Sequence, residues 1–349
     1  MYENRFYSAD TQGDFHLFDV GNLVLESGQT LRGCELAYRT QGALNADRSN
    51  AVLVTTWFSG TAKVMQDVYV GSGHALDPAK YFIIIVDQIG GGVSSSAHNM
   101  ARPQAMGKFP KLSIGDDVMA QHKLITEHFG IEVLALVVGG SMGGQQVYEW
   151  AVRHPKMVAR AAVIAATAQI SLHQTVFVDT LIEAITSDPA WCGGWYASGT
   201  DVRAGMDRMA KIVATAAWST EFYQEKRWNT VLGMSSVDDF INGVMKAYFE
   251  PMDPNVLLDQ MHKWQRADVA QHRGSDLAAV LARITAKVFV MPISHDGFFP
   301  PQECEADCKL IPNAELRVIQ SPEGHMGLNG FEPEYMRQVD RYLTELLTT

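Results

Sequence analysis

The sequence of 349 residues has few cysteines, no block of basic residues and no long apolar run. Its four cysteines follow no zinc-binding pattern, so we expect free thiols and no metal site. A net charge of -11 without a basic patch argues against nucleic acids and anionic membranes as partners. No stretch approaches the roughly 18 apolar residues of a membrane span, and the N-terminus has no secretory signal. We therefore expect a cytoplasmic protein.

Two of the cysteines, Cys304 and Cys308, stand four residues apart on one face of an expected helix. A site made of two thiols is one interpretation of this spacing. Ordinary packing is the preferred one, because unpaired cysteines usually behave as small apolar side chains.

Strand-like and helix-like segments alternate along most of the chain. Residues 80–88 form a nearly continuous apolar run, which is typical of a strand buried on both faces of a parallel sheet. Further strands are expected at 16–26, 34–42, 50–58, 133–138, 161–166, 287–293 and 314–320, and helices at 113–129, 143–154, 301–310 and 333–347.

This alternation is interrupted once, between about 170 and 281, by a helical and aromatic-rich stretch. The sequence therefore predicts an α/β fold with a mostly parallel central sheet and helices on both of its faces. Residues 1–169 and 282–349 would form the core, and residues 170–281 an inserted helical lid.

The segment LALVVGGSMGGQQVYEW surrounds Ser141 with glycines where a buried strand is expected to end. Gly139–Gly143 fits the G-x-S-x-G pattern of a nucleophile elbow, which presents a serine on a strained strand-to-helix turn. Alternatives are a loop that only packs and a loop that binds phosphate. The second is disfavoured, because the Lys-Ser/Thr of a P-loop is missing and the spacing differs from G-x-G-x-x-G.

A serine hydroxyl needs a base, and this fold orders its triad as serine, acid, histidine. Asp296 follows a late apolar strand, and His325 follows the last strand in a loop with glycine. We therefore predict the triad Ser141, Asp296 and His325. Glu323 is an alternative partner for His325, and His295 is interpreted as a supporting or surface histidine.

The oxyanion hole is expected to use two backbone N–H groups. One belongs to Met142, the residue after the nucleophile, and the other to Phe58 in the loop after an early strand, with Trp57 as the alternative. Loss of one such donor typically costs about 3–4 kcal/mol. A second Gly/Ser-rich loop, 87–99, either shapes the mouth of the pocket or is a plain flexible loop.

Six stretches resemble the homoserine O-acetyltransferase branch of the α/β-hydrolases: VVGGSMGGQQVYEWAVRHP, LVTTWFSGTA, LDPAKYFIIIVDQIGG, AITSDPAWCGGWY, ISHDGFFPP and SPEGH. They spread from about Leu36 to the C-terminus. The resemblance implies an α/β-hydrolase fold with a helical lid, a homodimer formed through that lid and an acyl-serine intermediate. It also implies transfer of acetyl from acetyl-CoA to homoserine.

The chain departs from that family where the amino-acid substrate would be held. Ala210 and Ala217 stand where the transferases carry an Arg and a Tyr, and Met326 stands where they carry an Asp. A shift of register would let Lys211 or Arg208 replace the Arg. Without such anchors the pocket is apolar, and the two charges of homoserine would be left unpaired.

We therefore interpret the chain as a serine esterase of small, neutral, acetate-type esters, with water as the acyl acceptor and no cofactor or metal. Besides Ala210 and Ala217, the expected pocket residues are Trp57, Phe298 and Met326. An acyltransferase using acetyl-CoA is the first alternative, and a non-catalytic binder of small molecules is the second.

Overall fold

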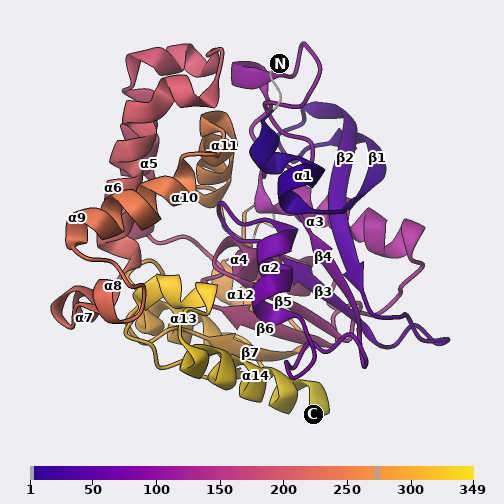
Figure 1. Ribbon diagram of the computed structural model, residues 1–349. Helices are drawn as coiled ribbons and strands as arrows, with labels where there is room; N and C mark the ends of the chain where they lie inside the picture. The colour runs from indigo at the N-terminus through magenta and orange to yellow at the C-terminus, as the bar shows by residue number, and fades with distance from the viewer. Residues whose placement is uncertain (1–3, 272–273, 275) are drawn as a thin grey trace.

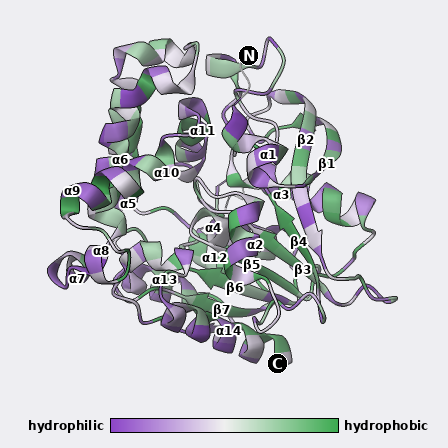
Figure 2. Cartoon of the chain, viewed as in Figure 1, coloured by the Kyte–Doolittle hydropathy of each residue, from purple (hydrophilic) through white to green (hydrophobic). Residues whose placement is uncertain are grey.

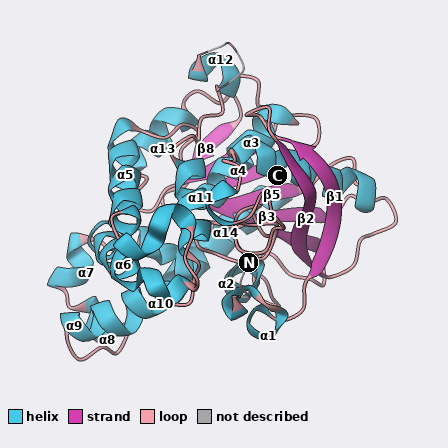
Figure 3. Cartoon of the chain, turned by 90° about the horizontal axis from the view of Figure 1, so that it is seen from above, coloured by secondary structure: helices cyan, strands magenta, loops and turns pink. Residues whose placement is uncertain are grey.

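The computed structural model describes residues 4–271, 274 and 276–349; the first three residues and positions 272, 273 and 275 lie outside the described part. Within it, an eight-stranded sheet occupies the centre, and a group of helices lies to one side of it (Figures 1 and 3). No helix in this part of the chain is long and apolar enough to cross a membrane.

The sheet is parallel except at one side, where β2 runs antiparallel to both of its neighbours. In spatial order the strands are β1 (His16–Val24), β2 (Thr30–Gln41), β4 (Phe82–Val86), β3 (Ala51–Thr55), β5 (Leu136–Gly140), β6 (Arg160–Ile164), β7 (Lys287–Met291) and β8 (Ala314–Leu316).

The central strands are buried on both faces, which explains their continuous apolar sequences (Figure 2). Successive side chains point to opposite sides, so Leu53 joins one hydrophobic core and Val52 and Val54 join the other. The first core includes α3 (Ile114–Lys123) and α4 (Met142–Arg153), and the second includes α2 (Ala62–Tyr69) and α14 (Pro333–Thr348). The predicted α/β architecture with helices on both faces is confirmed.

The segment between β6 and β7 is helical, as the sequence predicted, and most of it lies at the left of the sheet in Figure 1. Its helices are α5 (Leu172–Thr186), α6 (Arg203–Ala217), α7 (Thr220–Gln224), α8 (Arg227–Thr230), α9 (Val237–Phe240), α10 (Ala247–Phe249), α11 (Pro254–Trp264) and α12 (Leu277–Leu281). The N-terminus of α11 is fixed by Pro254 in its first turn and by the Asp253 carboxylate, which accepts the Val256 N–H at 3.0 Å.

Several element boundaries differ from the sequence expectation. Strand β8 ends at Leu316, and pairing resumes only at an isolated bridge between Ile319 and Ile293. The helix expected at 113–129 is α3 followed by a wider π-helical turn, Leu124–His128. Short helices at Ala9–Gln12 (α1) and Pro301–Cys308 (α13) complete the α-helices of the described residues. Cys304 and Cys308 of α13 are free and belong to the apolar core, as the packing interpretation expected.

Candidate active site

Ser141 lies at the sharp turn between the end of β5 and the start of α4. Its backbone has φ 54° and ψ -128°, a region that residues with a side chain rarely adopt. Its N–H donates to the Ile164 carbonyl at 2.9 Å, which ties the turn to the neighbouring strand β6. The strained turn places the hydroxyl beyond the carboxyl end of β5, as a nucleophile elbow requires.

The glycines around Ser141 are required by close approach of other atoms. A Cβ on Gly140 would lie 2.6 Å from Leu328 Cδ2, and one on Gly143 would lie 2.7 Å from the Thr55 carbonyl oxygen. One on Gly144 would meet Ala166 Cβ at 2.6 Å. Side chains at these positions would push the turn away from β3, β6 and the loop after His325.

Asp296 and His325 come from the loops that follow β7 and β8, at the same edge of the sheet as Ser141. The bridge between Ile293 and Ile319 holds these two loops side by side, and the Ser294 N–H donates to the Ile319 carbonyl at 2.9 Å. Neighbouring parallel strands deliver their carboxyl ends to one place, so residues distant in sequence meet there.

The three side chains form one hydrogen-bonded chain. His325 Nε2 lies 3.0 Å from Ser141 Oγ, and His325 Nδ1 lies 2.7 Å from Asp296 Oδ2. The other Asp296 oxygen, Oδ1, accepts the N–H groups of Phe298 at 2.7 Å and Phe299 at 3.0 Å. All three triad residues are buried. The geometry brings together the serine, acid and histidine chosen from the sequence.

The competing residues have other partners. Glu323 accepts a hydrogen bond from Arg227 Nε at 2.8 Å, and His295 Nδ1 lies near Ser294 Oγ and the Ser321 carbonyl. Burial raises the pKa of Glu323, and the Arg227 guanidinium acts against that shift. Asp296, rather than Glu323, is therefore the carboxylate that contacts His325.

Backbone donors are available next to Ser141 and in the loop after β3. Met142 is the first residue of α4, so its N–H has no acceptor within the helix. The Ser59 N–H is taken by Gln260 Oε1 at 2.7 Å. The N–H groups of Trp57 and Phe58 have no hydrogen-bond acceptor among the described residues, so both remain available for a bound oxyanion.

A cavity of about 690 Å³, including its open mouth, lies over Ser141 and His325. From the core its lining includes the predicted residues Trp57, Phe58, Phe298 and Met326, and from the lid Val213, Val244, Met245, Tyr248, Phe249 and Trp264. No Asp, Glu, Lys or Arg among the described residues lines it. The aromatic ring of Phe298 packs against the His325 ring, with centroids 4.7 Å apart.

Two predicted pocket residues require correction. Ala210 and Ala217 are fully buried in α6 but do not line this cavity; Val213, between them on the same face of the helix, does. Their short side chains are covered by packing, and the Ala217 carbonyl lies against Gly324. The possible replacements for the missing Arg are also elsewhere: Lys211 is exposed, and Arg208 donates to the Ala184 carbonyl.

The loop at 87–99 fits neither interpretation given from the sequence. It does not line the cavity, and residues 87–98 are buried. The hydroxyl of Ser94 donates to the Asp87 carbonyl at 2.8 Å, and that of Ser96 accepts the Gly92 N–H at 2.8 Å. Serine hydroxyls thus replace the backbone pairing that a loop lacks, and they fix its conformation.

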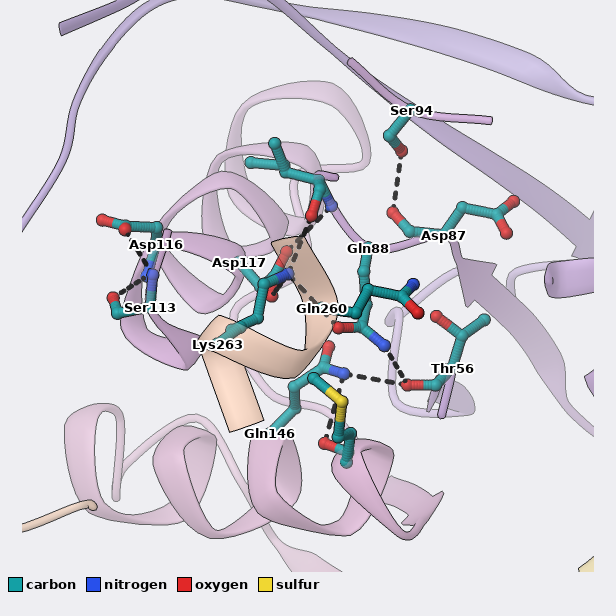
Figure 4. A network of polar contacts seen from close by, with 12 residues as sticks. Thr56, Asp87, Gln88, Ser94, Ser113, Asp116, Asp117, Gln146, Gln260 and Lys263 are labelled. Atoms are coloured by element: carbon teal, nitrogen blue, oxygen red, sulfur yellow. Dashed lines mark hydrogen bonds and ion pairs between the residues drawn. The ribbon is translucent and has the colours of Figure 1, made fainter. Parts of the chain in front are cut away.

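The sequence interpretation also missed a buried polar network behind the Phe58 loop (Figure 4). It includes Gln88 and Gln146, which both donate to the Thr56 carbonyl, and the fully buried Lys263 of the lid. A single lysine in a helix gives no sequence signal of this role, because most lysines are exposed.

Comparison with known proteins agrees with this architecture. The model of the alpha/beta hydrolase fold family matches residues 60–328. The chain belongs to this family.

Two curated relatives match almost the whole chain. It is 53% identical to an ethyl acetate hydrolase of Pseudomonas veronii, over 99% of both chains. It is 47% identical to a probable esterase of Corynebacterium glutamicum, again over 99% of both. The solved structure of the acetyl esterase MekB superposes with a TM-score of 0.98 at 53% identity, covering 99% of this chain and 100% of that one.

The homoserine O-acetyltransferases are more distant relatives. The enzyme named so in Thermobifida fusca is 32% identical, over 97% of this chain and 95% of its own. The resemblance recognised in the sequence is therefore confirmed, and the more similar proteins are those named as esterases.

Proposed function

We propose that the protein is a serine carboxylic ester hydrolase that cleaves small, neutral esters of the acetate type. The observation that carries this proposal is the hydrogen-bonded chain from Ser141 through His325 to Asp296 beneath a cavity with no charged side chain among its described lining residues. The names of the relatives at 47–53% identity, ethyl acetate hydrolase and probable esterase, support the same activity.

The mechanism follows from the geometry of the three side chains. His325 Nε2 accepts the Ser141 proton while Oγ attacks the ester carbonyl. Asp296 accepts the Nδ1–H, which keeps Nε2 free as the base and stabilises the imidazolium that forms. The N–H groups of Met142 and Phe58 would hold the oxyanion of the tetrahedral intermediate.

The intermediate collapses when the imidazolium protonates the leaving alcohol, which leaves an acyl group on Ser141. Water then follows the same path: His325 takes its proton, the hydroxide oxygen adds to the acyl carbonyl, and the carboxylic acid departs as Ser141 recovers its proton. The net reaction is ester plus water to acid plus alcohol, and it consumes no other reactant.

Transfer of the acyl group to homoserine is the alternative to hydrolysis. A zwitterion entering this cavity would exchange water for aromatic and aliphatic side chains, with no cation or carboxylate to pair it. A small neutral ester loses far less hydration free energy on the same transfer, and water needs no charged side chain to bind it. The lining therefore favours water as acceptor.

Two parallel assays test the proposal. Hydrolysis of p-nitrophenyl acetate and ethyl acetate is measured beside CoA release from acetyl-CoA with homoserine present. We expect rapid ester cleavage and negligible CoA release. Formation of acetylhomoserine at a rate that matches ester cleavage would instead identify a transferase, and no turnover of any ester by the purified wild type would leave only a binder.

We also propose a homodimer formed through the lid, in a cytoplasmic location. Leu172 and Val176 lie one turn apart on α5, with 86% and 67% of their surfaces exposed. Paired apolar side chains this exposed on one helix face are typical of a contact surface. The cytoplasmic location is supported by the four cysteines, all of which are free thiols.

A further inference from the structure

The loop that carries Phe58, residues 56–60, is held from behind by side chains of the core and of lid helix α11 (Figure 4). We call these residues the oxyanion loop. The Thr56 carbonyl accepts Gln88 Nε2 at 2.8 Å and Gln146 Nε2 at 3.0 Å. The Trp57 carbonyl accepts Gln88 Nε2 at 3.1 Å. One amide group, that of Gln88, therefore binds two successive carbonyls of the loop.

The contact to the Trp57 carbonyl matters because of peptide geometry. The Trp57 C=O and the Phe58 N–H belong to one planar, trans peptide unit, so they point in opposite directions. Holding the carbonyl from behind thus aims the N–H the other way, on the side of the loop that faces the cavity. The next N–H, that of Ser59, is fixed by Gln260 of α11.

The amide of Gln88 is itself oriented by Lys263. An amide has a donor end and an acceptor end of nearly equal shape, and its neighbours decide which end faces which way. Lys263 Nζ has only donors, and it lies 3.2 Å from Gln88 Oε1 and 2.7 Å from the Ile89 carbonyl. The ammonium group therefore requires the oxygen of Gln88 on its side and leaves the NH₂ for Thr56 and Trp57.

Burial of the Lys263 ammonium at this position has a large desolvation cost. Lys263 is fully buried, and its partner Asp117, at 2.5 Å, is fully buried too. A buried ion pair contributes little net stability compared with an apolar pair of the same volume. Lys263 Nζ and Asp117 do not contact the cavity, so neither group binds substrate directly. Lys263 Nζ instead donates to three acceptors, in Asp117, Gln88 and Ile89, which fix the ammonium at one point behind the oxyanion loop.

We propose that Gln88 and Lys263 are positioning residues for ester hydrolysis: Lys263 orients the Gln88 amide, and Gln88 holds the Trp57–Phe58 peptide with its N–H toward the oxyanion. The lid thereby takes part in the chemistry through α11 as well as through the cavity wall. This inference rests on the proposed function and on Phe58, rather than Trp57, as the donor.

The test compares three variants with the wild type: Gln88→Met, Lys263→Met/Asp117→Asn, and the combination of all three changes. The double substitution removes the lysine without leaving an unpaired buried carboxylate. Active sites are counted by the end point of covalent labelling with a phosphonate ester, so that kcat is expressed per folded site. Hydrolysis of p-nitrophenyl acetate and inhibition by phenylboronic acid, whose adduct with Ser141 mimics the tetrahedral intermediate, are then measured.

We expect Gln88→Met to lower kcat by about 10- to 100-fold with KM within about threefold, since loss of a whole oxyanion donor costs about 10²- to 10³-fold. Boronate affinity should fall by the same factor as kcat/KM. Lys263→Met/Asp117→Asn should lower kcat and boronate affinity by a smaller factor. Because Lys263 acts through Gln88, the combined variant should be no slower than Gln88→Met alone.

Gln104→Met is the matched control. The Gln104 amide also donates to a carbonyl, that of Thr30 at 2.8 Å, and accepts an N–H, that of Arg32 at 3.0 Å, but none of these residues lines the cavity. It should keep wild-type kcat per site. The inference is overturned if Gln88→Met retains kcat and boronate affinity within twofold, or loses only thermal stability. A wild type that hydrolyses no ester would overturn the proposed function first, and this inference with it.

Discussion

The two carboxylate oxygens of Asp296 have separate partners, and this division sets the state of His325. Oδ1 accepts two backbone N–H groups, from Phe298 and Phe299, so the carboxylate is held in place by its own loop. Oδ2 faces His325 Nδ1, which must then carry the proton. Nε2 is left without a proton and faces the Ser141 hydroxyl, as a general base must.

Asp296→Asn should lower kcat for p-nitrophenyl acetate by about 10⁴-fold, with little change in fold. The amide oxygen of Asn would still accept the N–H of Phe298, so its NH₂ would face His325 Nδ1. That contact forces the proton onto Nε2, where it blocks abstraction from Ser141. Circular dichroism provides the control for folding. A loss smaller than tenfold would show that Asp296 does not set the tautomer.

Phe298 limits the cavity beside His325. Its ring packs between His325 and Phe177, with both centroid distances at 4.7 Å. Phe298→Ala should open space there. The kcat/KM for p-nitrophenyl hexanoate should then rise relative to that for the acetate by about tenfold or more, because a single methylene in a hydrophobic pocket changes kcat/KM by about tenfold or more. The contact of the backbone N–H with Asp296 is unaffected by this truncation. An unchanged ratio of the two kcat/KM values would show that the acyl chain does not bind beside Phe298.

At the scale of elements, the ends of the parallel strands decide where the site forms. Ser141, Asp296 and His325 follow β5, β7 and β8, and helix α2 follows β3 in the same way. The start of α2 is held by Asp87, at the end of β4, whose Oδ1 accepts the Ala62 N–H at 2.8 Å. Burial raises the pKa of Asp87 to about 7, against the opposing effects of the Ala62 N–H and Arg39.

This raised pKa predicts a dependence of stability on pH. An unfolded Asp titrates near pH 4, so between about pH 4 and 7 the native Asp87 binds more protons than the unfolded one. Its contribution to the free energy of unfolding therefore falls as pH rises through that range. Asp87→Asn removes the titration but keeps an oxygen for the Ala62 N–H.

The unfolding free energy of Asp87→Asn minus that of the wild type should rise by about 2–3 kcal/mol from about pH 5 to 8. Urea unfolding at both pH values measures it. Burial also raises the pKa values of Asp117 and Asp307 to about 6. Both residues are present in both proteins, so their contributions cancel in the difference. A difference that stays constant with pH would contradict the raised pKa.

The sequence was most informative where local chemistry decides the structure. Strands such as Phe82–Val86 were predictable because burial on both faces demands apolar residues, and the turn at Ser141 because close approach demands glycine. The order of serine, acid and histidine then selected Asp296 and His325. Tertiary contacts were not predictable: Val213 lines the cavity instead of Ala210, and a loop that reads as flexible is buried through its serine hydroxyls.

At the scale of the whole molecule, the helical segment between β6 and β7 forms one wall of the cavity and also reaches behind the oxyanion loop. Val213 and Trp264 contribute to the wall, and Gln260 contacts the loop itself. The same segment exposes Leu172 and Val176 on α5. This helical segment therefore contributes both to the wall of the cavity and to the surface through which we expect two copies to associate.

If two copies associate through this face as we propose, the double substitution Leu172→Glu/Val176→Glu should give a monomer, because carboxylates facing each other across the contact would be desolvated and repel. Light scattering after size-exclusion chromatography gives the mass of each protein. Hydrolysis of p-nitrophenyl acetate should persist in the variant, since neither side chain lines the cavity. A monomeric wild type, or a variant with the wild-type mass, would exclude this face as the interface.

Hydrolysis by the proposed route requires an acyl group that Ser141 carries and releases to water. Acid quenching during turnover of p-nitrophenyl acetate, followed by peptide mass spectrometry, tests this directly. We predict one acetyl group on the peptide that contains Ser141, none on the same peptide of Ser141→Ala, and conversion of the adduct to free acetate even when homoserine is present. Turnover without an adduct on that peptide, or an adduct that decays to acetylhomoserine, would contradict the account.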